Sequence, residues 1–290
     1  MKRKVRILLG VLLFLCAIAG YDLYRNNLRC QTEITLTQYI LDTNLTQEIR
    51  IVHLTDLHSH SFGDDNDTLV NLVLDQNPDL VCITGDMVDR SSKNPEVILD
   101  LIRKLSAHIP VYYGYGNHEK SYMAASSTDL TPLLEEAGAT VLDCTYQDII
   151  IKDQNLRIGG YHGYYRQPGM YDITPEQREA ELSFADRFED TDTFKLLLCH
   201  IPTAWLDWEY IHRYSVDLVL SGHYHGGQIR LPVLGALYAP YIGLFPEYTE
   251  GLFTGTQATC VLSRGLGNSP ALPRINNLPE VVVIDLIPEK

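Results

Sequence analysis

The chain has 290 residues, of which 45% are hydrophobic and 21% are charged, and its formal net charge is −14. These proportions are typical of a globular protein with a full core, and the length fits one large domain or two small ones. The strong negative charge disfavours non-specific binding to a nucleic-acid backbone, so we expect no nucleic-acid partner.

Residues 1–30 differ from the rest of the chain, because a basic start is followed by the apolar run 7–20. A cleaved signal peptide fits this layout, and Ala-Ile-Ala at 17–19 offers a small-x-small cleavage pattern. An uncleaved signal anchor fits the flanking Tyr21 and Tyr24, although about 15 apolar residues span only ~22 Å of a ~30 Å hydrocarbon core. We favour the anchor over the signal peptide, and over a buried helix of a cytosolic protein.

The positive-inside rule then predicts a single-pass protein of the cell membrane, with the basic end in the cytoplasm and the rest of the chain outside it. Cleavage of the segment would instead give a secreted protein. The polar stretch 31–48 follows as a linker or a first strand, and residues 49–290 are expected to form the main domain.

This domain begins with strands and helices in alternation. The predicted strands are 49–54, 80–84 and 111–115, and the helices that follow them are 66–76, 97–105 and 129–137. The alternation is the βαβ rhythm of a largely parallel sheet covered by helices.

Later segments are mostly strand-like and suggest a second sheet packed on the first. They are 148–152, 156–161, 194–199, 217–220, 259–263 and 281–286, and one polar helix is expected at 175–189.

Six cysteines are spread singly along the chain, without a C-x-x-C pair. Cys82, Cys199 and Cys260 lie in apolar strand-like runs, where a free thiol behaves as a small hydrophobic group. We therefore expect buried structural cysteines and no disulfide framework.

Five short segments place Asp, Asn and His residues directly after predicted strands. They are Asp56-Leu57-His58, Gly85-Asp86-Met87-Val88-Asp89, Gly116-Asn117-His118-Glu119, Cys199-His200 and Gly222-His223-Tyr224-His225. Within the first segment, alternate residues of an extended chain would face the same way, so Asp56 and His58 are expected on one side. Loops at strand ends can converge in space, so the five segments together indicate one catalytic centre.

The side chains in these segments supply oxygen and nitrogen donors without a thiolate, which favours Mn, Fe, Zn, Co or Mg over copper or iron–sulfur chemistry. Two divalent ions that share Asp86 could bind phosphoryl oxygens, activate a water and stabilise in-line displacement. The seven candidate ligands are Asp56, His58, Asp86, Asn117, His200, His223 and His225.

The remaining histidines are judged by their context in the sequence. His53, His108 and His212 lie in strand or helix segments and are expected to be structural. His60 and His162 could each reach the site from a nearby loop.

The order D-x-H, G-D-x-x-D, G-N-H-E, a lone His and G-H-x-H resembles the calcineurin-like metallophosphoesterase family over roughly residues 49–286. The last of these motifs, G-H-Y-H-G-G-Q at 222–228, looks most like that of the bacterial branch with an N-terminal membrane segment. That branch includes cell-envelope phosphodiesterases and relatives that cleave lipid-linked diphosphates. The resemblance implies an α/β fold, a four-layer α/β/β/α sandwich, with a hydroxide bridging two metals that attacks phosphorus without a covalent enzyme intermediate.

The resemblance also implies the role of each site residue by position. The first metal would be held by Asp56, His58, Asp86 and His225, and the second by Asp86, Asn117, His200 and His223. His118 would be a general acid or charge stabiliser at the leaving group, oriented by Asp89. Arg90 could touch a phosphate oxygen, although not all family members have an arginine there.

The region 231–253 carries three prolines among large apolar residues, too many for a regular element. It follows the last histidine motif, so it is either an ordinary packed loop or an apolar lip beside the site. A lip and a membrane segment favour a phosphodiester or a lipid- or envelope-linked diphosphate as the substrate. The alternatives are a protein or small-molecule phosphomonoesterase and a non-catalytic scaffold with this fold.

Overall fold

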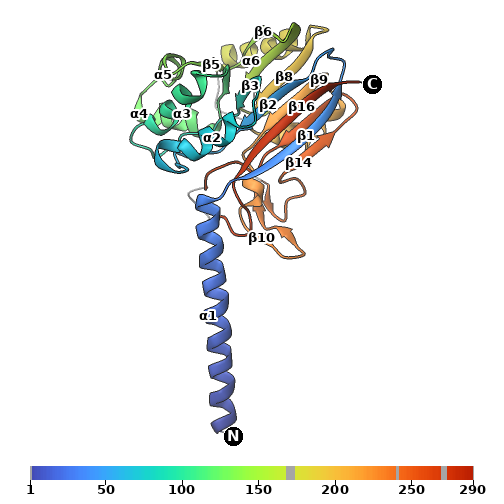
Figure 1. Ribbon diagram of the computed structural model, residues 1–290. Helices are drawn as coiled ribbons and strands as arrows, with labels where there is room; N and C mark the ends of the chain where they lie inside the picture. The colour runs from blue at the N-terminus through green and yellow to red at the C-terminus, as the bar shows by residue number, and fades with distance from the viewer. Residues whose placement is uncertain (1, 168–173, 240–241, 269–272, 290) are drawn as a thin grey trace.

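The computed structural model describes residues 2–167, 174–239, 242–268 and 273–289, in which helix α1 (Lys2–Thr32) projects from a layered α/β domain (Figure 1). Two six-stranded sheets pack face to face, and helices cover their outer faces. This confirms the four-layer α/β/β/α sandwich.

The first sheet has the order β1-β16-β2-β3-β4-β5. Its strands are β1 (Thr35–Thr43), β16 (Glu280–Pro288), β2 (Ile49–Leu54), β3 (Leu80–Ile83), β4 (Val111–Gly114) and β5 (Ala139–Leu142). Strands β2 to β5 run parallel, as the βαβ rhythm predicts. The helices of this half are η1 (Asp64–Asn66), α2 (Asp67–Leu74), α3 (Glu96–Ser106), α4 (Asn117–Ser126) and α5 (Thr131–Glu136).

The expectation that residues 281–286 belong to the second sheet is wrong. Strand β16 lies between β1 and β2 in the first sheet, parallel to β1 and antiparallel to β2. Its residues are buried up to Leu286, as a central strand requires, whereas β1 at the edge alternates between half-buried and exposed residues. The stretch 31–48 thus contains an edge strand, β1.

The second sheet has the order β14-β15-β9-β8-β7-β6. Its strands are β14 (Gly251–Thr254), β15 (Ala258–Leu262), β9 (Val216–Ser221), β8 (Phe194–Cys199), β7 (Gln154–Tyr161) and β6 (Thr145–Ile151). Helix α6 (Pro175–Glu189), the polar helix of the sequence, packs Phe184 and Phe188 on this sheet's outer face. The short turns η2 (Pro202–Ala204) and η3 (Tyr210–His212) lie in the connection from β8 to β9.

The core between the sheets is apolar and consists mainly of aliphatic side chains. Ile51 of β2 and Cys82 of β3 meet Leu196 of β8 and Leu220 of β9, and none of these side chains is exposed to solvent. Burying such side chains stabilises the domain by about 1.5–3 kcal/mol for each large one. The two sheets therefore hold their strand ends, and the loops that follow them, in a rigid relation.

Helix α1 is longer than the apolar run in the sequence suggests. Among the described residues it contains one segment, Leu9–Thr32, that is long and apolar enough to cross a membrane by length and composition. At 1.5 Å per residue this segment is ~36 Å long, against a ~30 Å hydrocarbon core, but its last turns, from Asn26 on, lie against the domain. The same features also fit a signal sequence.

The carboxyl-terminal end of α1 is fixed to the domain. Asn26 exchanges two hydrogen bonds with Asn276, at 2.9 and 2.7 Å, and Cys30 is buried. The carbonyl of Gln31 bonds to the ring Nε2 of His60 at 2.8 Å. The helix therefore leaves the domain next to the loop that follows β2.

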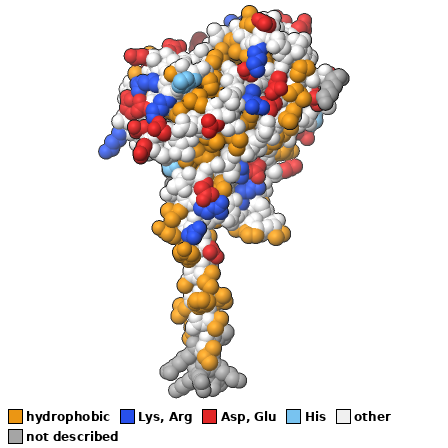
Figure 2. All heavy atoms as spheres, in the orientation of Figure 1, with side chains coloured by type: hydrophobic (Ala, Val, Ile, Leu, Met, Phe, Trp, Pro, Cys, Tyr) orange, Lys and Arg blue, Asp and Glu red, His pale blue; other side chains and the backbone are white. Residues whose placement is uncertain are grey.

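The region 231–253 is more regular than its prolines suggest. It contributes to two short hairpins, β10 (Arg230–Leu231) with β11 (Gly235–Ala236) and β12 (Tyr238–Ala239) with β13 (Gly243–Leu244), so the prediction of no regular element is wrong. Pro240 and Tyr241 lie outside the described residues. The hairpin of β10 lies on the side from which α1 projects (Figure 1), and Figure 2 shows hydrophobic side chains at this base of the domain.

The six cysteines are all free, as expected. Cys30, Cys82, Cys199 and Cys260 are buried, in agreement with a packing role. The expectation of burial is wrong for two of them, because Cys16 is exposed on α1 and Cys144 is half-buried where β5 passes to β6.

Candidate metal centre

The five predicted segments converge because they follow parallel strands whose ends meet at one edge of the sandwich. The loops after β2 and β3 are bonded together, since Asp56 N–H donates to the Gly85 carbonyl at 2.9 Å and His58 N–H to the Asp86 carbonyl at 3.0 Å. In the second sheet, Gly222 N–H donates to the His200 carbonyl at 3.1 Å. Each pair of loops thus aims its side chains into the same space.

The backbone at these positions is not extended, so the strand-alternation argument for Asp56 and His58 is wrong. Five of the seven predicted ligands have left-handed backbone, with φ between 49° and 72°: Asp56, His58, Asp86, His223 and His225. Non-glycine residues adopt this region at a cost of about 1–3 kcal/mol and concentrate at functional sites. The left-handed turn at each residue redirects its side chain from the strand toward the common centre.

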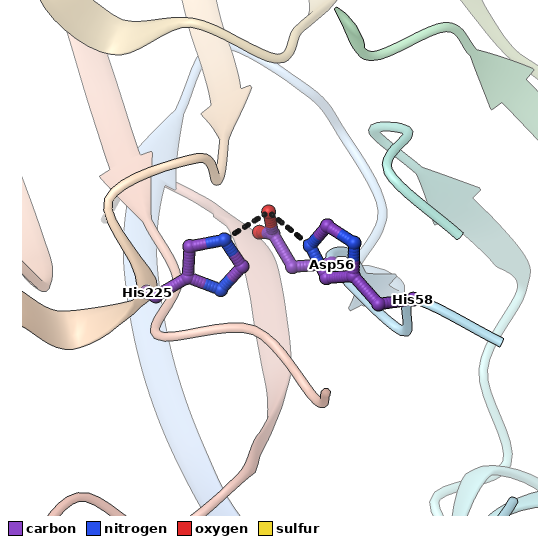
Figure 3. A group of neighbouring side chains, drawn as sticks. All are labelled: Asp56, His58 and His225. Atoms are coloured by element: carbon purple, nitrogen blue, oxygen red, sulfur yellow. Dashed lines mark ion pairs between the residues drawn. The ribbon is translucent and has the colours of Figure 1, made fainter. Parts of the chain in front are cut away.

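One group of ligands gathers around Asp56. His225 Nε2 lies 3.6 Å from Asp56 Oδ1, and His58 Nε2 lies 3.9 Å from the same oxygen. Figure 3 shows the two rings on either side of the carboxylate, carried by different loops. These separations exceed a hydrogen bond, and the three donor atoms lie close enough together to share one ion.

The second group gathers around Asp86. His200 Nε2 lies 3.1 Å from Asp86 Oδ2 and 3.2 Å from His223 Nδ1. The opposite nitrogen of His200, Nδ1, lies 2.8 Å from the Thr84 carbonyl, which requires a donated N–H there. Burial opposes protonation of His200, but the charge of Asp86 outweighs it and raises the pKa of His200 to about 9. Nε2 faces the centre and would ligate a metal once that proton is lost, as in histidines that ligate metals.

Several buried polar atoms at the centre make no hydrogen bond within the described residues. They are both ring nitrogens of His58, Nδ1 of His225 and Oδ1 of Asn117. A buried polar atom without a partner costs about 1–3 kcal/mol, so such atoms rarely cluster without a ligand. Carboxylate, amide and imidazole donors of this kind fit divalent metal ions.

The pKa values of the two carboxylates at the centre are shifted in opposite directions. Burial raises the pKa of Asp56 to about 7. Burial also opposes ionisation of Asp86, but His200, by charge and hydrogen bonding, outweighs it and holds the pKa of Asp86 well below its ordinary value. Burial lowers the pKa of His58 to about 4 and that of His223 to about 3, so both rings are neutral and able to ligate at pH 7.

His118 lies at the rim of the centre, on the first turn of α4. Its ring packs edge-on against His58 with centroids 4.5 Å apart, and Nε2 lies 4.0 Å from Asp86 Oδ2. Its Nδ1 accepts the backbone N–H of Arg90 at 3.2 Å and lies 3.6 Å from Asp89 Oδ2. Asp89 therefore faces His118, as the resemblance implies, whereas Arg90 contacts it through its backbone and has an exposed side chain.

Glu119, the last residue of the G-N-H-E segment, supports the centre without being a predicted ligand. Its side chain is fully buried and accepts the backbone N–H groups of Asp86, Met87 and Gly116, each at 2.8 Å. It also accepts the Tyr113 hydroxyl at 2.8 Å. One carboxylate therefore joins the two loops that carry Asp86 and Asn117, and only its place in the motif could have pointed to it.

Two glycines permit close approach at the ligands. A Cβ on Gly116 would overlap Asp86 Oδ1, and a Cβ on Gly222 would overlap Asp56 Oδ2. Any side chain at either position would push a ligand carboxylate out of place.

The other histidines occupy separate surroundings. His53 is buried against the Thr84 hydroxyl at 2.7 Å, and His60 contacts α1, so neither reaches the centre. His108 and His212 lie at the surface. His162 directly follows β7 and lies beside Asp143, 3.7 Å from that carboxylate.

The sequence profile of the calcineurin-like phosphoesterase family matches residues 49–227, and the chain belongs to this family. The match covers every predicted ligand. The protein is accordingly a metal-dependent phosphoesterase, a hydrolase of phosphoester bonds.

Two bacterial relatives match the chain over most of its length. The uncharacterized metallophosphoesterase YkuE of Bacillus subtilis is 29% identical over 242 residues, which are 82% of this chain and 78% of the relative. The phosphodiesterase YaeI of Escherichia coli is 27% identical over 241 residues, which are 82% of each chain.

Proposed function

We propose that the centre holds two divalent ions and hydrolyses a phosphodiester or a lipid- or envelope-linked diphosphate. The observation that carries the proposal is the place of Asp86, which lies near both His58 of the first group, at 4.0 Å, and His200 of the second, at 3.1 Å. Both distances end at Oδ2, so this oxygen would face both ions, while Oδ1 accepts the backbone N–H of His118 at 2.7 Å. When bound, the ions supply an acidified water and stabilise negative charge on the phosphoryl oxygens.

The proposed ligand sets follow the two groups. Asp56, His58, Asp86 and His225 hold one ion, and Asp86, Asn117, His200 and His223 hold the other. Mn, Fe, Zn, Co and Mg all suit these donors. Chelation followed by loading with single metals identifies the ion that supports turnover.

His118 serves the leaving group in this proposal. Because Nδ1 accepts the Arg90 N–H, the ring proton of neutral His118 is on Nε2, which faces the centre. From there it donates a hydrogen bond to the leaving oxygen, and a protonated ring is stabilised by Asp89 on the Nδ1 side. A general acid and a hydrogen-bond donor differ in their pH–rate profiles, since only the acid loses activity as the imidazolium deprotonates.

Two features support a substrate with an apolar part. The hairpins expose Val233 and Leu234 at the turn of the first, and Leu244 and Phe245 at the end of β13 in the second, each more than half exposed. Asn276 connects the first hairpin to α1, because its backbone N–H donates to Asn26 and its side chain to the Arg230 carbonyl. The apolar hairpins and the apolar helix share one side of the domain (Figure 1), and both would meet a lipid surface there.

We propose accordingly that residues 1–30 anchor a single-pass protein in the cell membrane, with the catalytic domain over 49–290 outside the cytoplasm. The mass of the mature N-terminus tests the anchor against secretion after cleavage. A mass that begins beyond Ala19 would overturn it.

The substrate proposal is tested by kinetics on aryl phosphate diesters, aryl phosphate monoesters and a lipid diphosphate in vesicles, each with Mn²⁺. We expect diester or diphosphate turnover to exceed monoester turnover. A strong monoester preference would support a phosphomonoesterase instead. Full metal occupancy without turnover of any of these would support a scaffold.

A further inference from the structure

We propose that Asp143, Cys144 and His162 form a separate site for one divalent metal ion, of which zinc is the expected occupant. The site is outside the centre described above and does not depend on the proposed function. One donor atom of each residue lies within 4.8 Å of the other two, and the three differ in chemistry: carboxylate oxygen, thiolate sulfur and imidazole nitrogen. Such a mixed set with sulfur suits zinc and cobalt better than magnesium or calcium.

The spacing of the donors supports an ion between them. Asp143 Oδ1 lies 3.7 Å from His162 Nδ1. Two ligands at ~2.0–2.2 Å from one tetrahedral zinc lie roughly 3.4 Å apart. The paired donors of the main centre span 3.1 to 4.0 Å in this structure, so the new group has the spacing of a metal site within the same molecule.

Lys120 holds Asp143 in the orientation that ligation needs. Its ammonium lies 2.5 Å from Asp143 Oδ2, which leaves Oδ1 turned toward His162. A ligating carboxylate is commonly held by such a partner on its second oxygen. The positive charge of Lys120 also offsets one of the two negative charges that a bound thiolate and carboxylate bring together.

The group lines a pocket of about 380 Å³, together with Lys120, Gln177 and Glu181. The pocket gives an ion a route from solvent and leaves space for a water or another ligand to complete the coordination. Sites with three protein ligands and one open position are typical of catalytic rather than structural zinc.

The topology brings this site next to the main centre. Tyr161 at the end of β7 pairs with Cys199 at the end of β8, so His162 and His200 follow neighbouring strands. On α4, Lys120 lies three residues after Asn117, on the same face of the helix.

Binding the ion converts the Cys144 thiol to a thiolate and releases its proton to solvent. The test uses the full-length protein in detergent, stripped of metal and titrated with Co²⁺ alone. A cobalt–thiolate bond gives near-ultraviolet charge-transfer absorption, which the oxygen and nitrogen ligands of the main centre do not give. We expect this band in the wild type and its loss in Cys144→Ser, with one metal equivalent fewer per chain.

Cys16→Ser is the matched control, because it removes an exposed thiol far from the pocket, and it should keep the band. His162→Ala retains the cysteine, and we expect the Co²⁺ affinity measured from the charge-transfer band to fall at least tenfold. Absence of the band in folded wild type, or its persistence in Cys144→Ser, would overturn the proposal. His118→Ala should lose turnover but keep the band, so failure of the proposed hydrolysis is separable from failure of this site.

Discussion

Glu119 Oε2 accepts the backbone N–H of Asp86 at 2.8 Å, so the first turn of α4 holds the loop that carries Asp86. The same side chain accepts the Gly116 N–H, next to Asn117. A residue that touches no expected ion thus fixes the relative place of two ligands, one from each of two loops. Removing a residue that holds metal ligands in this way commonly weakens metal affinity 10–100-fold.

Glu119→Gln should therefore lower both stability and metal affinity. The glutamine amide can accept through one oxygen only and would point an N–H₂ group at backbone donors. We expect a loss of about 3 kcal/mol in the free energy of unfolding of the metal-free protein and 10–100-fold weaker metal binding. Denaturant melts and competition with a chelator measure the two. Glu136→Gln, at an exposed position on α5, is the control, and equal behaviour of both variants would refute the role of Glu119.

Asp86→Asn should impair both metals, whereas His225→Ala should impair one. Among the described residues, the Asp86 carboxylate lies near imidazole donors of both groups, whereas the second variant changes a single neutral donor of one group. Metal analysis after gel filtration should show a larger loss for Asp86→Asn, with turnover reduced at least 100-fold in both. If the two variants lose equal amounts of metal, Asp86 does not bridge.

His118→Ala should reduce turnover by about 10²–10⁴-fold while metal content stays unchanged. The loss should be smaller for an aryl leaving group than for an alkyl one, because a weakly basic oxygen needs less assistance. Comparing the two substrates at several pH values checks this. Ser121→Ala, one turn further along α4 at an exposed position, should leave the rates as they are. Loss of metal in His118→Ala would instead make His118 a ligand.

Leu234→Glu combined with Phe245→Glu should reduce hydrolysis of a substrate embedded in vesicles. Both side chains are exposed, at 66% and 58%, and burying each in lipid contributes about 1.5–3 kcal/mol. We expect at least a tenfold loss on vesicles and none on a soluble aryl diester. Ile150→Glu is matched in exposure, at 70%, but lies on β6, far from α1 (Figure 1). An equal effect of both changes would argue against a membrane-facing lip.

Asp285→Asn should destabilise the first sheet in a pH-dependent way. Burial opposes ionisation of Asp285, but its bonds from Arg50 and Gln38, at 2.6 Å each, outweigh that and lower the pKa. Because the pKa of Asp285 is lower in the folded than in the unfolded state, its ionised carboxylate stabilises the fold at pH values above the unfolded pKa of about 3.9. This stabilisation is lost as the pH falls through the folded pKa. We expect a loss of about 2 kcal/mol at pH 7 that shrinks as the pH falls below the unfolded pKa. Asp42→Asn on β1, exposed, should show no such difference in urea melts at the two pH values.

The strands and most helices were predictable because apolar runs and amphipathic periods are local properties. Helix α4 was not, since its ten residues contain few apolar side chains and no apolar stripe. The position of β16 in the first sheet could not be predicted either, because the pairing of strands depends on contacts between residues far apart in the chain. Its pairing with β1 joins residues more than 240 positions apart.

The donor chemistry and the order of the candidate ligand loops could be predicted, because residue type and position after a strand are local properties of the chain. How those side chains meet depends on contacts between distant parts of the folded chain. Left-handed turns at Asp56 and Asp86, rather than strand alternation, aim them at one centre. The fold alone also brought Asp143 and Cys144 to His162, since the end of β5 and the end of β7 come together only when the two sheets pack.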